Sequence, residues 1–434
     1  MRVMIAAMPF AGHVAPFLPV IDELVARGHQ VELYSGAAFS ETVQSHGAVF
    51  APWTAAPNFD ENDLAATFPR LQGRKGIAQL LINVEDLFIQ TGAAQASDLQ
   101  EIWKARPWDV LLADGLSVGA TLIAELTPAP WLSLSVVPLN MPSRDMPPSG
   151  MGIVPGRTAI GRARDALLRS IVPLMDGRLT KALNAAREKA GLPPTRAGFG
   201  SALLSPRRVL ALGSASTDFP RSDLPDHVRW IGRVVTSPPS HAIERPSWWP
   251  ELSAPGRLVV LVTQGTQNVD PTDLLRPAID ALAAESDVLT VVTTGRRGVA
   301  TLPFPLPSNV RVADFLPFEE LLPHVDVMIT NGGWGGTLAG LAHGLPLIIA
   351  GGDLDKPEIA ARIAYRGAGI DLRTGRPSAQ KVAAAFQRIR SDDGFRLAAR
   401  AIGDELAALG GAATIADEVA HLRGSGDLRG SGRM

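Results

Sequence analysis

The chain has 434 residues, too many for one ordinary hydrophobic core, so its length predicts two domains of roughly 200 residues each. Its 41 basic and 43 acidic side chains are mixed along the sequence and leave a net charge of −2, which gives no basic patch for nucleic acid. The absence of cysteine excludes disulfides, thiol catalysis and zinc–thiolate sites.

The first half of the chain reads as alternating strands and helices. Residues 2–8 form an apolar run of strand length, and a helical pattern follows from Pro16 to Arg27. Further strands are predicted at 31–35, 109–113 and 131–137, with a helix at 118–126. Strands that are apolar on both faces predict a parallel sheet covered by helices on both sides. We therefore predict a Rossmann-like α/β domain over residues 1–217.

The N-terminal apolar run is not typical of a targeting segment. It contains prolines and a histidine, and it lacks a cleavage site of small residues. No apolar stretch elsewhere reaches the length that spans a bilayer. We therefore expect a cytoplasmic protein with no membrane partner.

Two irregular segments, residues 54–95 and 138–156, interrupt this pattern. The first segment and its approach carry aromatic residues: Trp53, Phe59, Phe68 and Phe88. Long irregular segments at the carboxyl ends of strands build binding walls in open α/β sheets. Ordinary surface loops with some buried aromatic residues are an equally good explanation from the sequence alone.

The second half repeats the pattern and predicts a second doubly wound domain over residues 251–394. Strands are expected at 257–266, 288–295, 310–316 and 325–330, and helices at 272–284, 337–343 and 358–365. A proline-rich stretch at 218–250, with one embedded strand VRWIG, is predicted to link the two halves. The polar, glycine-rich tail at 423–434 is expected to be disordered.

His13 and Asp114 are candidate catalytic residues, because each follows an apolar strand of the first half. A histidine at that edge can act as a general base near neutral pH if another group fixes its tautomer. If the two strands are close in the sheet, Asp114 can accept from one ring nitrogen and leave the other free to take a proton. The alternatives are a structural histidine and a helix N-cap at Asp114.

The stretch TNGGWGGTLAGLAHGLP, residues 330–346, is a candidate phosphate cradle. It reads as strand, glycine turn and helix, with four glycines between residues 332 and 336. A helix N-terminus presents unpaired N–H groups, and glycines let an anion approach them closely. The Walker A pattern is missing, and so is G-x-G-x-x-G near His13, so neither simple ATP hydrolysis nor a dinucleotide site is favoured. TQGT, residues 263–266, offers a weaker glycine turn.

Taken in order, these motifs resemble the GT-B glycosyltransferases of family 1, in particular the bacterial enzymes that glycosylate macrolides and other natural products. The resemblance runs from GHVAP and RGHQVELYS through LLADG, VRWIG, TQGT and VRVADFLPFEELLP to NGGWGGTLAGLAHGLPLIIAGGDLDKPEIAARIAYRGAGIDL. It implies two Rossmann-like domains facing across a cleft. It also implies metal-independent, inverting transfer from a UDP- or dTDP-sugar to a hydroxyl of an apolar acceptor, with no cofactor and no metal site.

The resemblance implies a role for each candidate residue. His13 is the base and Asp114 its orienting group. The implied donor site consists of Gly12, Gln264, Gly265, Thr266, Phe315, Leu316, Asn331, Gly332, Gly333, Trp334, Gly335, Gly336, Asp355 and Lys356. Phe315 would stack on the nucleotide base, and the backbone of Leu316 would bind the pyrimidine edge. The acceptor side is expected to consist of Phe10, Trp53, Phe59, Phe68, Phe88, Leu139 and Met141. Helices over residues 395–422 are expected to pack back on the N-terminal domain.

The sequence departs from the family pattern at four positions of the donor half. Asn331 stands where relatives carry histidine, and Gly336 stands at a usual Thr or Ser. Lys356 replaces a glutamine and Ile359 an asparagine. These changes keep two other hypotheses open, a non-catalytic nucleotide-binding accessory protein and a nucleotide-sugar epimerase. The oligomeric state, the sugar and the acceptor are not predicted.

Overall fold

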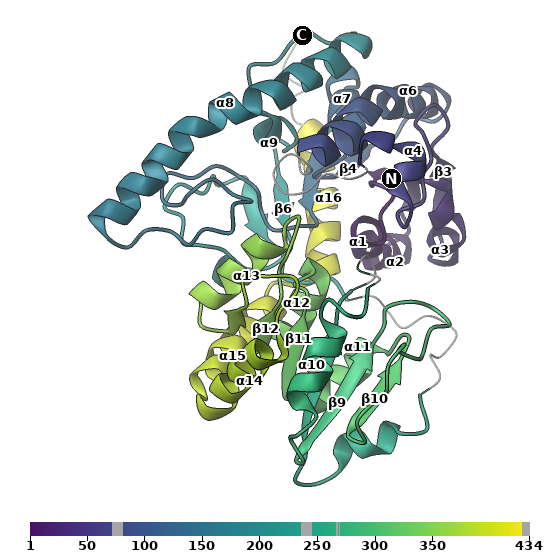
Figure 1. The fold of residues 1–434 in the computed structure, drawn as a ribbon. Coiled ribbons are helices and arrows are strands. Elements are labelled where there is room, and N and C mark those ends of the chain that lie inside the picture. The colour runs from purple at the N-terminus through teal and green to yellow at the C-terminus, as the bar shows by residue number, and fades with distance from the viewer. Residues whose placement is uncertain (72–80, 236–244, 266–267, 269, 428–434) are drawn as a thin grey trace.

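The computed structural model describes residues 1–71, 81–235, 245–265, 268 and 270–427. It shows an N-terminal and a C-terminal α/β domain, one above the other in Figure 1. The N-terminal sheet has seven parallel strands in the order β3-β2-β1-β4-β5-β6-β7, and the C-terminal sheet has six in the order β10-β9-β8-β11-β12-β13. The predicted pair of doubly wound parallel-sheet domains is confirmed.

The strands of the N-terminal sheet are β1 Arg2–Ala6, β2 Gln30–Ser35, β3 Val49–Pro52, β4 Val110–Asp114, β5 Trp131–Ser135, β6 Val209–Ala211 and β7 Val228–Trp230. Its α-helices are α1 Ala11–Val14, α2 Leu18–Ala26, α3 Ser40–Ser45, α4 Leu64–Thr67, α6 Gln90–Ala105, α7 Val118–Leu126, α8 Ala159–Lys189 and α9 Phe199–Ala202. Short 3₁₀ turns lie at η1 Ala15–Phe17, η2 Ala37–Phe39, η3 Pro69–Leu71 and η5 Ala215–Thr217, and η4 Val84–Ile89 is a π-helix.

The C-terminal domain contains β8 Leu258–Thr263, β9 Val288–Thr293, β10 Val310–Ala313, β11 Val327–Thr330, β12 Leu347–Ile349 and β13 Gly369–Asp371. Its α-helices are α10 Leu275–Leu282, α11 Phe318–Leu321, α12 Trp334–Ala342, α13 Lys356–Tyr365, α14 Ala379–Ser391 and α15 Gly394–Ala407, and its 3₁₀ turns are η6 Trp249–Ser253 and η7 Leu322–His324. α16 Gly411–Asp427 ends the described chain.

The elements of the structure differ from the predicted ones in three places. β7, placed in the linker by its sequence, pairs with β6 and forms the edge of the N-terminal sheet, so that domain extends beyond residue 217. α6 begins within the segment 54–95 that was expected to be irregular, and α8 covers residues for which no element was predicted. α16 continues to Asp427, so residues 423–427 are helical rather than part of a disordered tail, and residues 428–434 lie outside the described chain.

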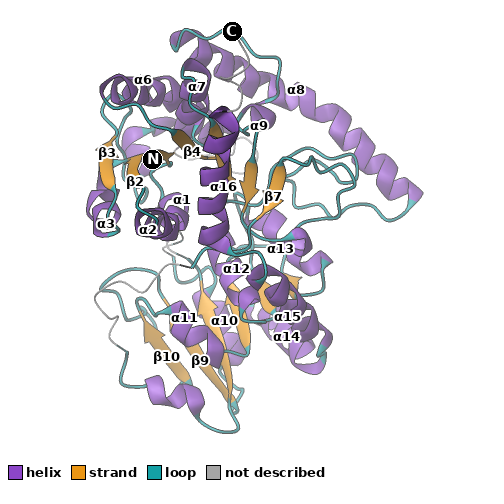
Figure 2. Ribbon diagram, turned by 180° about the vertical axis from the view of Figure 1, so that it is seen from behind, coloured by secondary structure: helices purple, strands orange, loops and turns teal. Residues whose placement is uncertain are grey.

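The two C-terminal helices, α15 and α16, lie at the junction of the domains. α15 lies against α12, and a Cβ on Gly403 would come within 2.7 Å of the Leu341 carbonyl oxygen, which shows how closely these helices approach. α16 runs up along α2 and β4 of the N-terminal domain (Figure 2), where Arg27 Nη1 lies 2.6 Å from Asp417 Oδ1. α15 also reaches the N-terminal domain, since Glu405 Oε1 accepts the Ser216 N–H at 3.4 Å, so both helices contact it.

The core follows both sheets and continues across the domain junction. Val3, Ile5, Leu112 and Leu134 of the first sheet belong to the same buried cluster as Leu261 of the second. In the part of the chain that the structure describes, no helix combines the length and the apolar composition needed to cross a membrane.

Candidate active site

The order of the strands brings the two candidate catalytic residues together. β1 lies between β2 and β4, so the order of the strands in the sheet reverses at β1. Open α/β sheets form a crevice at such a switch point. Ala6 of β1 is in register with Ala113 of β4. Asp114 therefore ends β4 close to the short helix α1, which follows β1 and carries His13.

His13 and Asp114 form the contact expected from their sequence positions. Nδ1 of His13 lies 2.7 Å from Oδ2 of Asp114. The same carboxylate accepts the Met8 N–H at 3.0 Å and the Leu116 N–H at 3.0 Å, and its side chain is fully buried. An ionised Asp114 can accept only, so the proton of a neutral imidazole lies on Nδ1 and Nε2 is the basic nitrogen.

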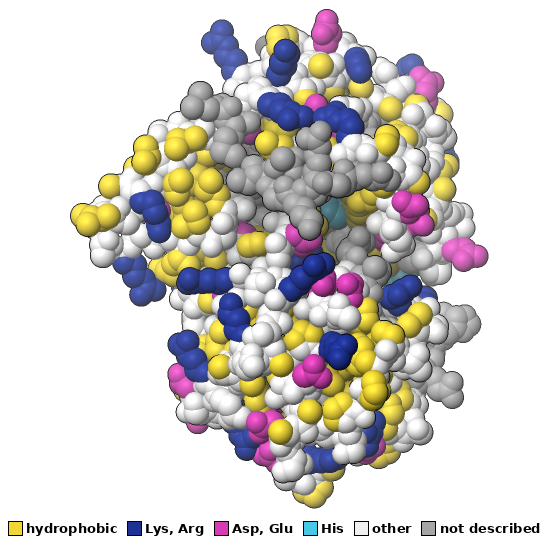
Figure 3. All heavy atoms as spheres, viewed as in Figure 1, with side chains coloured by type: hydrophobic (Ala, Val, Ile, Leu, Met, Phe, Trp, Pro, Cys, Tyr) yellow, Lys and Arg dark blue, Asp and Glu magenta, His cyan; other side chains and the backbone are white. Residues whose placement is uncertain are grey.

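Acidic groups raise the pKa of His13 above its ordinary value of 6.5. Burial alone lowers that pKa, but the charge of Asp114 and its hydrogen bond outweigh burial, and Asp355 and Glu61 add smaller contributions. Burial raises the pKa of Asp355, and the charge of His13 opposes this shift. Because Asp355 belongs to the C-terminal domain, this coupling places its carboxylate across the domain junction from His13. In Figure 3 the molecule is hollowed between the two domains.

Replacing Asp114 by asparagine is expected to lower the His13 pKa. The variant removes the largest favourable charge and leaves the burial, which favours the neutral ring. In the wild type the raised pKa means that the pair contributes stability below the unfolded-state pKa, and this contribution is lost as the pH rises through the folded-state pKa. NMR titration of the His13 ring protons measures the shift, and His46, which contacts Asp22 elsewhere, is the internal reference. An unchanged His13 midpoint would contradict the assigned cause.

An aromatic cluster surrounds His13. The Phe10 ring centroid lies 5.6 Å from that of His13, and the Phe88 centroid lies 6.3 Å away. Phe59 contacts Phe10 at 5.2 Å and Phe68 at 5.4 Å. These four phenylalanines are only partly buried. The predicted aromatic residues therefore come together beside the candidate base. Trp53 contacts Phe59 at 6.0 Å but is itself buried, so it supports the cluster from behind.

Leu139 and Met141 do not join this cluster. The Leu139 side chain is fully buried with Val209, Ala211 and Val228, and Met141 packs on the same group. Segment 138–156 is irregular, as expected. After β5, however, it turns its apolar side chains under β6 and β7 rather than toward His13. The prediction that Leu139 lines the acceptor side is wrong for this reason.

Two carboxylates that the sequence reading missed organise the aromatic side. Asp98 on α6 is buried and accepts the N–H groups of Thr54 at 3.0 Å, Ala55 at 2.7 Å and Ala56 at 3.2 Å, as well as the Tyr34 hydroxyl at 2.8 Å. It thus fixes the turn between Trp53 and Phe59. Glu61 accepts the Ala11 N–H at 3.0 Å, next to His13. Asp98 could have been found from the sequence, because it lies one residue before Leu99 on the apolar face of α6.

The second switch point lies in the C-terminal domain, where β8 is flanked by β9 and β11. Thr263 is in register with Thr330, so Gln264 and Gly265 leave the sheet beside Asn331. Gly265 has a φ of +72° and Gly332 a φ of +89°, and a Cβ on Gly332 would lie 2.8 Å from Ile349 Cγ2. Thr266, also predicted here, lies outside the described residues.

α12 begins three residues earlier than its sequence suggested. Gly333 is the N-cap, so Trp334, Gly335 and Gly336 form the first turn, whose N–H groups have no partner within the helix. Among the described residues, a Cβ on Gly335 would meet nothing within 4 Å, and one on Gly336 would meet only Met328 Cε at 3.8 Å. Packing therefore does not explain these two glycines.

The remaining donor-side candidates differ in exposure. The Phe315 ring is partly exposed, with the Arg297 guanidinium 5.3 Å from its centroid, and Leu316 is buried. Lys356 Nζ lies 2.5 Å from Asp353 Oδ1. The Trp334 side chain is buried. It packs closely on the N-terminal domain, as shown by the 2.9 Å that would separate its ring from a Cβ on Gly213. Only the backbone of Trp334 is therefore available to a donor.

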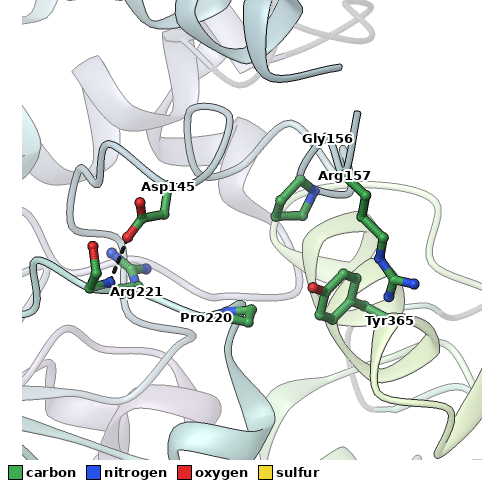
Figure 4. Close-up of a pocket in the computed structure, with 8 residues that line it drawn as sticks. Asp145, Gly156, Arg157, Pro220, Arg221 and Tyr365 are labelled. Carbon is green, nitrogen blue, oxygen red and sulfur yellow. Dashed lines mark hydrogen bonds between the residues drawn. The ribbon is translucent and has the colours of Figure 1, made fainter. Parts of the chain in front are cut away.

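A separate pocket of about 400 Å³ lies at the domain junction. Figure 4 shows Asp145 and Arg221 on the left, Gly156 and Arg157 on the right above Tyr365 of α13, and Pro220 at the bottom between the two groups. The Arg157 guanidinium lies 4.8 Å from the Tyr365 ring centroid. None of the predicted site residues lines this pocket, so it is distinct from the surroundings of His13.

Comparison with known proteins assigns the family. Residues 279–422 match the model of the erythromycin biosynthesis protein CIII-like C-terminal domain. The chain is 40% identical over 412 residues to 4'-demethylrebeccamycin synthase of Lentzea aerocolonigenes, covering 94% of this chain and 96% of that protein. The chain belongs to this glycosyltransferase family.

A second relative and a solved structure agree with this assignment. UDP-glucosyltransferase A1 of Starmerella bombicola is 31% identical over 423 residues, covering 93% of this chain and 88% of that protein. The solved glycotransferase of kitacinnamycin superposes on the fold of this glycosyltransferase with a TM-score of 0.73 at 23% identity, covering 97% of this chain and 98% of that one. The predicted GT-B glycosyltransferase family and fold are confirmed.

Proposed function

We propose that this glycosyltransferase moves a sugar from UDP or dTDP to a hydroxyl of an apolar small molecule, with inversion and without a metal ion. The observation that supports this most strongly is the buried His13–Asp114 contact of 2.7 Å at the β1–β4 switch point, with Asp355 across the domain junction. Asp114 holds the Nδ1 proton and leaves Nε2 to take the proton of the acceptor hydroxyl.

The transfer is a single displacement. The acceptor oxygen forms a bond to the anomeric carbon as its proton passes to Nε2, and the bond from that carbon to the diphosphate oxygen breaks. The electron pair of that bond leaves with the nucleoside diphosphate. First-turn N–H groups of α12 and the turn at Gly265 supply the dipoles that neutralise its charge. Asp114 stabilises the imidazolium that forms.

The four partly exposed phenylalanines beside His13 supply an apolar wall for the acceptor. Phe315 is the candidate platform for the nucleotide base, since its ring remains partly exposed. Asp355 and Lys356 lie at the start of α13, and we propose that they face the sugar.

The function is tested by titrating the protein calorimetrically with UDP and dTDP. The protein is then incubated with UDP-glucose or dTDP-glucose and a panel of hydroxylated macrolides and flavonoids. We expect nucleotide binding together with acceptor-dependent release of the diphosphate and formation of a glycoside. Binding without turnover on any acceptor would favour an accessory protein, and a changed sugar without transfer would favour an epimerase.

Gly335→Ala is expected to stabilise the fold and weaken nucleotide binding. Alanine in the first turn of α12 meets nothing within 4 Å and is the better helix former, so unfolding free energy is expected to rise by about 0.5–1 kcal/mol. The same methyl group stands where the diphosphate would approach the N–H groups. Urea unfolding and UDP calorimetry measure the two effects on the same samples. Unchanged UDP affinity would show that the diphosphate does not approach Gly335.

A further inference from the structure

Asn331 is buried between the two turns that would hold the diphosphate. Its Nδ2 donates to the carbonyl oxygen of Gln264, at the end of β8, and its Oδ1 accepts the Gly333 N–H at 3.4 Å. The side chain of Asn331 is only 7% exposed. One amide thus joins the exit of β8 to the N-cap of α12.

The residues around Asn331 pack closely on its side-chain amide. A Cβ on Gly265 would lie 3.3 Å from Nδ2 and 3.4 Å from Oδ1 of Asn331, so the turn after Gln264 passes directly over the amide. The Thr263–Thr330 register fixes which backbone groups the amide meets. The Gln264 side chain strengthens the same turn, since its Nε2 donates to the Asn268 carbonyl oxygen at 2.9 Å.

We propose that Asn331 is a positioning residue rather than a phosphate ligand. It holds the turn at Gly265 and the start of α12 at the spacing at which their N–H groups face one diphosphate. One N–H of Nδ2 donates to the Gln264 carbonyl oxygen and Oδ1 accepts from Gly333, so the protein sets the orientation of the amide, and we assign the diphosphate to the backbone dipoles of the two turns. The inference rests on the proposed function, because it assigns the device that shapes the donor site.

The test compares the wild type with Asn331→Ala and Asn331→Asp. Alanine removes both bonds, and aspartate keeps the acceptor for Gly333 but turns an oxygen toward the Gln264 carbonyl. Hydrogen exchange is followed in the ligand-free protein on peptides that contain Gly265 and Gly333. UDP, dTDP and uridine are titrated separately. We expect faster exchange in both variants and a loss of roughly tenfold or more in UDP and dTDP affinity, with uridine affinity little changed.

Asn184 provides a matched control. Its Nδ2 donates to the Thr195 carbonyl oxygen at 3.1 Å and its Oδ1 accepts the Thr195 N–H at 2.8 Å, a clamp of the same kind on α8. Asn184→Ala is expected to destabilise the fold to a similar degree without altering exchange near Gly333 or the affinity for UDP.

The outcomes separate the possibilities. Weaker UDP binding in Asn331→Ala with unchanged exchange in the ligand-free protein would mean that the amide contacts phosphate directly, and would overturn the proposal. Unchanged UDP binding would overturn it as well. A wild type that binds neither UDP nor dTDP would overturn the proposed function itself, while the exchange comparison would still show whether Asn331 joins the two turns.

Discussion

His13→Ala is expected to reduce sugar transfer by roughly 10²- to 10⁴-fold, the range that a well-placed general base contributes. Nucleotide binding is expected to change little, because the donor-side candidates other than Gly12 lie in the C-terminal domain and the substitution leaves the Gly12 backbone in place. Transfer is expected to fall because the 2.7 Å contact with Asp114 makes Nε2 of His13 the basic nitrogen beside the aromatic cluster, and alanine removes it. Steady-state kinetics and UDP calorimetry on the same preparation measure the two quantities.

The chain offers a close control for this variant. His46 Nδ1 lies 2.7 Å from Asp22 Oδ1, which repeats the His13–Asp114 geometry on the α2–α3 side of the domain. His46→Ala removes a ring of the same kind without touching the site, so its turnover is expected to match the wild type. If His13→Ala retained full turnover, His13 would not be the base.

Arg362→Met is expected to lower the free energy of unfolding by about 3–5 kcal/mol, because it leaves the buried carboxylate of Glu358 without its cation and removes one of the two cations paired with Asp218. Arg362 is fully buried, with Nη1 3.1 Å from Asp218 Oδ1 and Nη2 3.1 Å from Glu358 Oε1. Its Nη2 also donates to the Leu139 carbonyl oxygen at 3.1 Å. The network joins α13 of the C-terminal domain to the N-terminal side of the junction, so the two domains are expected to lose their fixed relation as well.

Urea unfolding measures this loss, and two further variants control it. Arg390→Ala breaks an exposed contact with Asp287 of 2.6 Å, which solvent screens, and is expected to change the free energy of unfolding far less. The double variant Glu358→Gln, Arg362→Met removes that buried pair together and leaves Asp218 paired with Arg221, so it is expected to recover much of the stability. A single variant Arg362→Met as stable as Arg390→Ala would show that the buried network does not hold the junction.

The features that follow from local patterns were predictable. Apolar runs identified the strands, and the carboxyl end of each strand pointed to His13, Asp114 and Asn331. Parallel topology then brought these residues to the switch points. The aromatic residues of the first excursion were also placed on the correct side, since Phe59, Phe68 and Phe88 come together beside His13.

Features that depend on distant contacts were not predictable. Arg362 meets Asp218 across 144 positions of the chain, and nothing near either residue in the sequence marks it as buried. α6 was missed because its buried face carries Thr91, Gln95 and Asp98, whose polar groups are satisfied by other parts of the fold. Leu139 was assigned to the acceptor because of its position after β5, although packing under β6 decides where it points.

A single displacement at the anomeric carbon, with His13 as base, is the central step of the proposed mechanism. The measurement that tests it is the configuration of the product, read by NMR from the anomeric coupling of the glycoside formed from UDP-glucose or dTDP-glucose in the presence of EDTA. We expect a glycoside of opposite configuration to the donor, with one diphosphate released per product and the reaction undiminished by the chelator. A product with retained configuration, or one formed only when a metal ion is supplied, would contradict the proposed mechanism.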